Sequence, residues 1–172
     1  TAADPYLIEN GAQLAAATVA VKAVANNKYY FKLVKDIRLN DTTSANWKDT
    51  AKNWKWADVR FQGNFDGNGH TIDGLYYSGS QYRIGLFAYV GDSTIYNFKM
   101  TNAYIKDTNS ETGLAFVAGQ ASAAVTFDKI YIDDTCYFEA PNTTGVAGIM
   151  GRCNGAVTIT NSAVNATIIG KS

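Results

Sequence analysis

Short runs of β-branched and aromatic residues, separated by Gly, Asn, Asp and Ser, make up most of the chain beyond residue 58. Runs of this kind between turn-forming residues predict strands rather than helices. The clearest early strand candidate is KYYFKLVKDIRL, residues 28–39. Between it and the later runs, the polar, Trp-rich segment 40–58 is predicted to be an inserted loop.

Three segments, starting at Ile84, Thr112 and Thr144, repeat one pattern. In each segment the second residue is Gly, which is followed by an apolar residue and then Ala or Phe. A second Gly comes soon after, and the segment continues as an apolar strand. The leading glycines are separated by 28 and 32 residues: Gly85, Gly113 and Gly145. The strands that follow are predicted to begin near Ile95, Phe127 and Ile159. These intervals are too irregular for a leucine-rich array, and the missing helical half excludes ankyrin and tetratricopeptide repeats. They indicate the coils of a parallel β-solenoid, whose short strands stack at about 4.8 Å.

One segment has the periodicity of a helix. Within residues 10–27, apolar side chains recur at spacings of three and four: Leu14, Ala17, Val21 and Val24. Asn10 is the expected N-cap, with Gln13 three residues later. We expect a helix over residues 11–26 that caps the N-terminal end of the core, because an uncovered first coil would expose apolar side chains and strand edges.

Two sequence patterns resemble a known family. The first is F-x-G-x-F-D-G-N-G-H-T-I-x-G-L over Phe61 to Leu75, and the second is G-L-F at Gly85 to Phe87 followed by I-Y-N-F at Ile95 to Phe98. Together they resemble the GLUG-type repeats of bacterial cell-surface and secreted proteins. The resemblance implies a right-handed parallel β-helix of the pectate-lyase-like class. The expected fold is therefore an all-β, short right-handed β-helix with an N-terminal capping helix.

Composition sets further limits on function. A chain of 172 residues fits one domain, 1–172, and 15 basic residues balance 15 acidic ones, so we expect no binding to nucleic acid. No apolar run approaches the roughly 20 residues of a membrane span, so no membrane insertion is expected. The chain opens without Met or a signal sequence, which indicates a fragment of a larger surface protein with adjoining domains.

The only histidine, His70, lies in the glycine-rich stretch of Phe61 to Leu75. A calcium loop would need more convergent oxygens than Asp66, Asn68 and Asp73 supply, while Gly67 and Gly69 suit tight turns with positive φ. The adjacent pair Asp133-Asp134 also suits a turn better than a pair of catalytic carboxylates. We therefore expect turns here and no enzyme: no catalytic residues, no metal ligands and no cofactor.

Two cysteines, Cys136 and Cys153, lie in successive repeats. Adjacent coils can bring side chains within disulfide reach, but the alignment puts Cys136 late in one repeat and Cys153 early in the next. A disulfide and two small buried side chains both remain open.

Aromatic residues provide the remaining functional hint. They cluster in the inserted loop and in the next turn: Trp47, Trp54, Trp56, Tyr76, Tyr77 and Tyr82. Exposed aromatic faces beside amides and hydroxyls bind sugar rings, so these six residues are a candidate platform for a polysaccharide or a cell-surface glycan. The alternative is that the tryptophans anchor the loop on the solenoid.

The expected function is a noncatalytic module of a secreted or cell-surface bacterial protein, in adhesion or carbohydrate binding. The alternative is a structural spacer within a surface adhesin. Residues expected to face the core are Ile72, Leu75, Leu86, Ile95, Phe98, Ile105, Leu114, Val125, Ile130, Val146, Ile149, Val157 and Ile159. No capping element follows Ile168-Ile169, so we expect the final coil to expose apolar side chains, or to contact a neighbouring copy.

Overall fold

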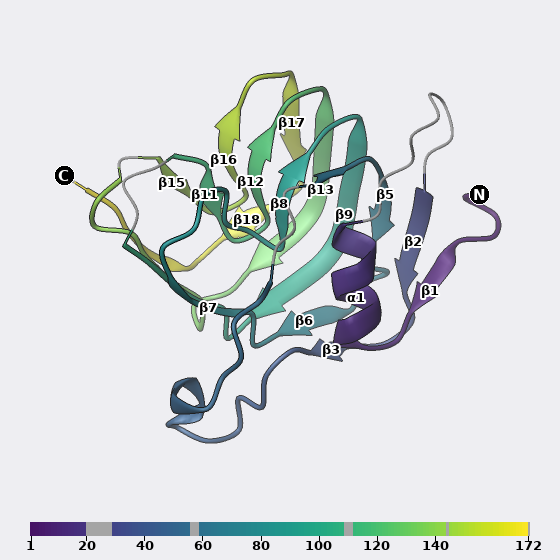
Figure 1. Ribbon diagram of the computed structural model, residues 1–172. Coiled ribbons are helices and arrows are strands. Elements are labelled where there is room, and N and C mark those ends of the chain that lie inside the picture. The colour runs from purple at the N-terminus through teal and green to yellow at the C-terminus, as the bar shows by residue number, and fades with distance from the viewer. Residues whose placement is uncertain (20–28, 56–58, 109–111, 144, 172) are drawn as a thin grey trace.

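Every strand pairing in the computed structural model is parallel, and the chain winds into a β-solenoid of about four turns (Figure 1). The structure describes residues 1–19, 29–55, 59–108, 112–143 and 145–171. Each turn of the chain, here called a coil, stacks on the preceding coil. The nearly all-β, parallel solenoid predicted from the sequence is confirmed.

Sheet A is the largest face of the solenoid, with the order β1-β2-β5-β9-β13-β17 and with β3, β6 and β18 paired beside this path. Its strands are β1 (Tyr6–Ile8), β2 (Tyr29–Leu33), β3 (Ile37–Arg38), β5 (Gly63–Asp66), β6 (Thr71–Asp73), β9 (Ser93–Thr101), β13 (Val125–Ile132), β17 (Val157–Thr160) and β18 (Ala163–Val164). The strand order follows the chain order, so the stack grows in one direction.

Two further sheets close the coil. Sheet B has the order β16-β12-β8-β4 and contains β4 (Arg60–Phe61), β8 (Phe87–Val90), β12 (Ala118–Ala121) and β16 (Met150–Cys153). Sheet C has the order β19-β14-β10-β7 and contains β7 (Tyr76–Gly79), β10 (Tyr104–Asp107), β14 (Tyr137–Glu139) and β19 (Thr167–Ile169). A short pair, β11 (Leu114–Ala115) and β15 (Val146–Ala147), precedes sheet B in the last two coils.

Left-handed residues form the corner within sheet A. Asn97 (φ 64°) in β9, Lys129 (φ 53°) in β13 and Asn161 (φ 48°) after β17 lie at corresponding positions of successive coils. A left-handed residue bends the strand while its neighbours stay extended, and Asn tolerates this conformation better than most residues. The repeated bend directs the next part of each coil toward sheet C.

Columns of apolar side chains run through the core from coil to coil. In one column Phe31, Phe65, Ile95, Phe127 and Ile159 occupy paired positions on β2, β5, β9, β13 and β17. The predicted starting points Ile95, Phe127 and Ile159 are therefore in register. The leading glycines are only partly in register. Leu114 pairs with Val146, which aligns Gly113 with Gly145. Ile84, however, bridges to Leu114, so Gly85 lies two residues out of register with Gly113.

The predicted helix begins where expected. α1 spans Gly11–Thr18, and the Asn10 side chain accepts a hydrogen bond from the backbone N–H of Gln13 at 2.9 Å. Gln13 Oε1 in turn accepts from the N–H of Glu9, so both side chains satisfy N–H groups at the helix start. Leu14 and Ala17 are buried in the core cluster with the first strands. Residues 20–26 of the predicted helix, including Val21 and Val24, lie outside the described residues.

The predicted core is confirmed for ten of the thirteen named residues, which are buried. Val146 and Val157 are half-buried, and Ile159 is 48% exposed, so placing Ile159 in the core was wrong. The reason is that, among the described residues, no strand pairs with β17 on the side away from β13. The expected exposure of apolar side chains there is confirmed at Ile159, Val164, Ile168 and Ile169.

The glycine-rich stretch forms the predicted turn between β5 and β6. Asn68 (φ 53°) and Gly69 (φ 77°) carry the positive φ values. Gly67 is required for a different reason than the one predicted: a Cβ there would lie 2.3 Å from Phe98 Cβ and 2.5 Å from the Asn97 carbonyl oxygen. Close approach of the next coil, rather than positive φ, explains this glycine.

Candidate functional site

The inserted loop is anchored on the solenoid by two of the three tryptophans. Trp47 begins the short 3-10 helix η1 (Trp47–Asp49), is buried, and places its ring edge-on to Tyr76 at 5.8 Å. Trp54 is also buried, and its indole N–H donates to the Leu86 carbonyl at 3.2 Å. The Trp54 backbone N–H donates to the Tyr76 carbonyl at 2.7 Å, which extends sheet C by one hydrogen bond. These contacts give both tryptophans a packing role.

Tyr76 belongs to a column of tyrosines on the outer face of sheet C. The Tyr76 and Tyr104 rings stack at 5.7 Å and 13°, and the Tyr104 and Tyr137 rings at 5.4 Å and 10°. Stacked rings cover each other's faces and leave mainly their edges and hydroxyls to solvent. Lys48 Nζ lies 4.6 Å from the centre of the Tyr104 ring, which ties the inserted loop to the same column.

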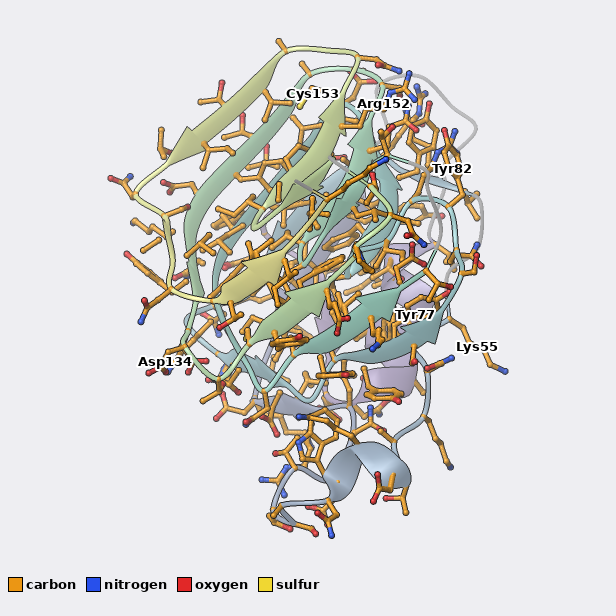
Figure 2. All side chains as sticks on the ribbon, turned by 90° about the vertical axis from the view of Figure 1, so that its left-hand side faces the viewer. Lys55, Tyr77, Tyr82, Asp134, Arg152 and Cys153 are labelled. Atoms are coloured by element: carbon orange, nitrogen blue, oxygen red, sulfur yellow. The ribbon has the colours of Figure 1, made fainter. Side chains whose placement is uncertain are left out.

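The other predicted platform residues occupy different environments. Tyr77 is buried on the inner side of sheet C, and burial, with a smaller contribution from the charge of Asp107, raises its pKa to about 12. Tyr82 is half-buried and donates to Gln120 Oε1 at 3.2 Å. Tyr77 and Tyr82 lie apart on the same side of the stack (Figure 2). Trp56 lies outside the described residues. The structure therefore brings Trp47, Trp54 and Tyr76 together, but not Tyr77 or Tyr82 with them.

Tyr82 takes part in a cluster built around Arg83. The guanidinium carbon of Arg83 lies 4.4 Å from the centres of both the Tyr82 and Tyr89 rings. Its Nε donates to Gln120 Oε1 at 2.6 Å, and Gln120 is buried. The cluster joins the segment before β8 to strands of two coils, so its contacts stabilise the stack.

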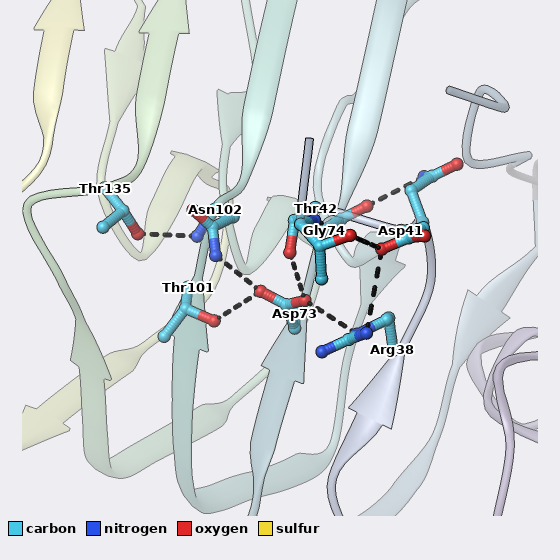
Figure 3. A network of polar contacts seen from close by, with 10 residues as sticks. Arg38, Asp41, Thr42, Asp73, Gly74, Thr101, Asn102 and Thr135 are labelled. Atoms are coloured by element: carbon cyan, nitrogen blue, oxygen red, sulfur yellow. Dashed lines mark hydrogen bonds and ion pairs between the residues drawn. The ribbon is translucent and has the colours of Figure 1, made fainter. Parts of the chain in front are cut away.

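A polar network surrounds Asp73 at the end of β6 (Figure 3). Asp73 Oδ1 accepts hydrogen bonds from Thr101 Oγ1 and Asn102 Nδ2, both at 2.8 Å. Asp73 Oδ2 accepts from Thr42 Oγ1 at 2.8 Å and lies 3.5 Å from Arg38 Nε. One carboxylate thus links the inserted loop, β3 and the next coil, which uses most of its acceptor capacity.

The surface beside this network is hollowed to about 410 Å³. Its lining mixes carboxylate, guanidinium, hydroxyl and amide groups: Asp36, Arg38, Thr42, Thr71, Asp73, Thr101 and Asn102. The Arg38 side chain is 59% exposed, and its Nη1 lies 3.8 Å from Asp41 Oδ1. In the sequence, this site corresponds to polar residues at or just after the ends of β3, β6 and β9. Recognising that these residues meet requires knowledge of the register between coils.

His70 contacts Asp36 at the rim of this hollow. His70 Nδ1 lies 3.2 Å from Asp36 Oδ1, and the same oxygen accepts the backbone N–H of Thr71 at 2.9 Å. The Thr71 hydrogen bond is the main reason that the pKa of Asp36 is lowered, with the interaction with His70 adding to it. The pair joins coil to coil at the turn that follows β5.

The two cysteines do not form a disulfide. Cys136 is buried before β14, whereas Cys153 is exposed in β16 and pairs in register with Ala121. Burial raises the pKa of the Cys136 thiol to about 11. Of the two alternatives left open by the sequence, Cys136 fits the buried side chain and Cys153 fits neither. Figure 2 shows Cys153 beside Arg152 on the final coil.

The Asp133-Asp134 pair lies in the turn after β13, as predicted. Asp133 Oδ1 accepts the Thr135 N–H at 3.1 Å, and Oδ2 pairs with Lys99 Nζ at 3.1 Å. Within the described ranges there is no group of three residues that could hold a metal ion. The described part of the chain also contains no helix long and apolar enough to cross a membrane.

Comparison with known proteins gives one informative relative. No family model and no solved structure matches the chain significantly. A protein of Evansella cellulosilytica, named as a Gly-rich membrane protein, is 33% identical over 110 residues. The matched region is 61% of this chain but only 12% of that protein. The chain is thus similar to a small part of a much longer protein.

Proposed function

We propose that the chain is a noncatalytic structural module, a rigid spacer within a larger secreted or cell-surface protein. The observation that carries this proposal is the direction of stacking. Because strand order follows chain order, the chain enters at the β1 end and leaves at the β17 end of the stack (Figure 1). A module with this path holds whatever adjoins it at opposite ends of a stiff body.

Side-chain chemistry supports the same function. Two of the aromatic residues predicted to form a binding platform are engaged in packing: Tyr76 stacks between coils, and Trp54 joins the loop to a coil. The tyrosine column and the Asp73 network both cross-link successive coils. Contacts of this kind resist bending of the stack.

The relative is consistent with a module of a larger surface protein. It is named as a membrane protein, and the similar region is a small share of its length. The GLUG-like motifs at Phe61 to Leu75 and Gly85 to Phe98 support assigning the module to bacterial surface proteins of that repeat type.

Single-molecule energy transfer tests the spacer directly. Dyes at Ala2→Cys and Lys171→Cys, in a Cys153→Ser background, label the two ends, while Cys136 is buried. A rigid spacer gives one narrow distance distribution, and the denatured protein supplies the flexible reference. A broad or multiple distribution in the native protein would contradict the proposal.

A second candidate function is glycan binding at the hollow beside Asp73. The mixed hydroxyl, amide and guanidinium lining is suited to sugar hydroxyls. A glycan array probed with the protein and with Arg38→Ala tests this, and Lys32→Ala, outside the hollow, is the matched control. Trp54→Ala is a poor control, because Trp54 is buried and its loss would alter the loop. Binding that Arg38→Ala removes and Lys32→Ala retains would favour glycan recognition over a spacer role.

A further inference from the structure

Asparagine followed by glycine occurs three times in the chain: Asn10-Gly11, Asn68-Gly69 and Asn154-Gly155. Because glycine has no Cβ, its backbone nitrogen approaches the side-chain carbonyl carbon of the preceding asparagine more easily than the nitrogen of a bulkier residue does. This approach is the first step of spontaneous deamidation. All three asparagines are exposed, so differences in reactivity have to come from the hydrogen bonds that hold each pair.

The pair Asn68-Gly69 is held on both sides of the bond that would form. The Asn68 side-chain amide donates to the Leu33 carbonyl of the preceding coil at 3.1 Å. The Gly69 N–H, whose nitrogen would be the nucleophile, donates to the Asn97 carbonyl of the following coil at 2.8 Å. Deamidation at this turn therefore requires two hydrogen bonds between coils to break.

The pair Asn10-Gly11 is held by one hydrogen bond. Asn10 is the N-cap of α1, and its Oδ1 accepts from the Gln13 N–H at 2.9 Å. Rotation of the Asn10 amide toward the Gly11 nitrogen would break this bond and remove the cap of the helix. The N-cap thus slows deamidation at this pair, but by fewer contacts than at Asn68.

The pair Asn154-Gly155 lies in the turn between β16 and β17 and lacks these restraints. The Asn154 backbone N–H donates to the Ala121 carbonyl at 2.9 Å, which holds the turn on the preceding coil. Within the part of the chain that the structure describes, neither the Asn154 side-chain amide nor the Gly155 N–H has a hydrogen-bond partner. The amide can therefore rotate toward the Gly155 nitrogen without breaking a contact.

This freedom belongs to the turn and does not depend on its coil being the last. The strand register aligns Ser122 and Ala123 of the preceding coil with Asn154 and Gly155. At that level sheet B has a strand on each side of β12, yet Ser122 and Ala123 are half-exposed. Among the described residues, the Ala123 N–H also has no hydrogen-bond acceptor. A turn at this corner is thus open to water even where coils lie on both sides.

We propose that Asn154 is a spontaneous deamidation site, and that reactivity falls in the order Asn154, Asn10, Asn68. The Gly155 nitrogen attacks Asn154 Cγ, and the new bond closes a succinimide ring. The bond from Cγ to Nδ2 breaks, and the side-chain nitrogen leaves as ammonia with the proton that the Gly155 nitrogen loses through solvent. Water then adds to either ring carbonyl and opens the ring to aspartate or isoaspartate. Water is the only reactant consumed.

The reaction changes both the charge and the backbone of the turn. A neutral amide becomes a carboxylate in residues 140–172, a stretch that contains Arg152 and Lys171 but no Asp or Glu. In isoaspartate the backbone also runs through the former side chain and is longer. Gly155 has little room for this, because a Cβ there would lie 2.7 Å from the Ala123 backbone. The inference is independent of the proposed spacer role.

Ageing of the folded chain in mildly alkaline, reducing buffer tests the proposal. Peptide mapping by mass spectrometry follows the aspartate and isoaspartate formed at each of the three pairs. Asn154 is expected to react more than about tenfold faster than Asn68, because two hydrogen bonds of ordinary strength must break at Asn68. Asn10, with one such bond, is expected to react at an intermediate rate.

The same chain in concentrated urea is the reference without structure. There the three pairs are expected to react at similar rates, because the hydrogen bonds that distinguish them are lost. Asn154→Gln is the matched variant, since its longer side chain disfavours ring closure. The early acidic shift on isoelectric focusing should disappear in this variant, while Asn10 and Asn68 react as before. Gly155→Ala is unsuitable, because its Cβ would overlap the Ala123 backbone.

Three results would overturn the proposal. The first is a folded chain in which Asn154 reacts no faster than Asn10 or Asn68. The second is a difference in rate that persists unchanged in urea, because it would then arise from neighbouring residues in the sequence and not from the fold. The third is an early acidic shift that remains in Asn154→Gln, which would place the reaction at another residue.

Discussion

The middle coil and the final coil use similar residues at equivalent positions, yet several of these positions are buried only in the middle coil. Phe127 on β13 is fully buried, whereas its partner Ile159 on β17 is 48% exposed. In sheet C the buried Phe138 of β14 pairs with Ile168 of β19, which is 36% exposed. In a solenoid, burial depends on having a coil on both sides, so stability is expected to be concentrated in the middle of the stack.

Truncation of Phe127 and Ile159 to Ala should show the difference in stability between the two coils most clearly. Phe127→Ala is expected to lower the free energy of unfolding by about 3–5 kcal/mol, because it leaves a cavity between two coils. Ile159→Ala is expected to cost about 1 kcal/mol or less, because its side chain is already half in water. Urea denaturation of both variants under dilute conditions checks this. Equal losses would mean that the final coil is as well packed as the middle one.

Substitution of two glycines of one turn, Gly67 and Gly69, separates the effect of contact between coils from the effect of backbone conformation. Gly67→Ala is expected to cost about 3 kcal/mol, because the new Cβ would overlap Phe98 and the Asn97 carbonyl of the next coil. Gly69→Ala, with φ 77° and no atom within 4 Å of the new Cβ, is expected to cost about 1 kcal/mol from backbone strain alone. Thermal unfolding of the pair measures the difference. A larger loss at Gly69 would contradict the close-approach explanation.

Substitutions in the inserted loop are expected to have a smaller effect on stability. Trp54→Phe should lower stability by about 1–2 kcal/mol, since the Leu86 carbonyl loses its indole donor in a buried site. Trp47→Phe keeps the edge contact with Tyr76 and is the milder control. Chemical denaturation followed by tyrosine fluorescence reports both. If the Trp47 variant is the more damaging, the loop is anchored mainly by Trp47.

The smallest expected effect is on pH dependence. Burial would raise the pKa of Asp133, but hydrogen bonds from Thr135 and Lys99 outweigh it and hold the pKa below the ordinary 3.8. The stabilisation is therefore complete above the ordinary value and is lost as pH falls below it, through the folded-state pKa. Asp133→Asn should flatten this acid limb of the stability curve, whereas Asp134→Asn should leave it unchanged. An unchanged limb in the Asp133 variant would refute the assignment.

Local patterns were enough to predict the architecture. Turn glycines, apolar runs and the repeat from Ile95 to Phe127 to Ile159 identified parallel coils in the correct register, and Asn10 marked the start of the helix. Gly85, which lies two residues out of register, shows the limit of aligning repeats by their glycines. Turns of unequal length shift a glycine motif without shifting the strands that follow it.

The candidate site could not be found in the same way. From sequence alone, Trp47 and Trp54 cannot be distinguished from exposed aromatic residues. Only their contacts with Tyr76 and Leu86 show that they anchor the loop. The Asp73 network joins residues about 30 positions apart, whose proximity depends on the register between coils. The exposure of Ile159 likewise follows from its position in the stack and not from its own coil's pattern.

Hydrogen exchange of the dilute, monomeric protein tests the central claim most directly: coils gain their stability from neighbours on both sides. The amides of β13 are predicted to exchange only through global unfolding, because β9 and β17 flank this strand. The amides of β17 are predicted to exchange much faster, through local opening of the final coil. Equal protection of β13 and β17 in the monomer would contradict the account.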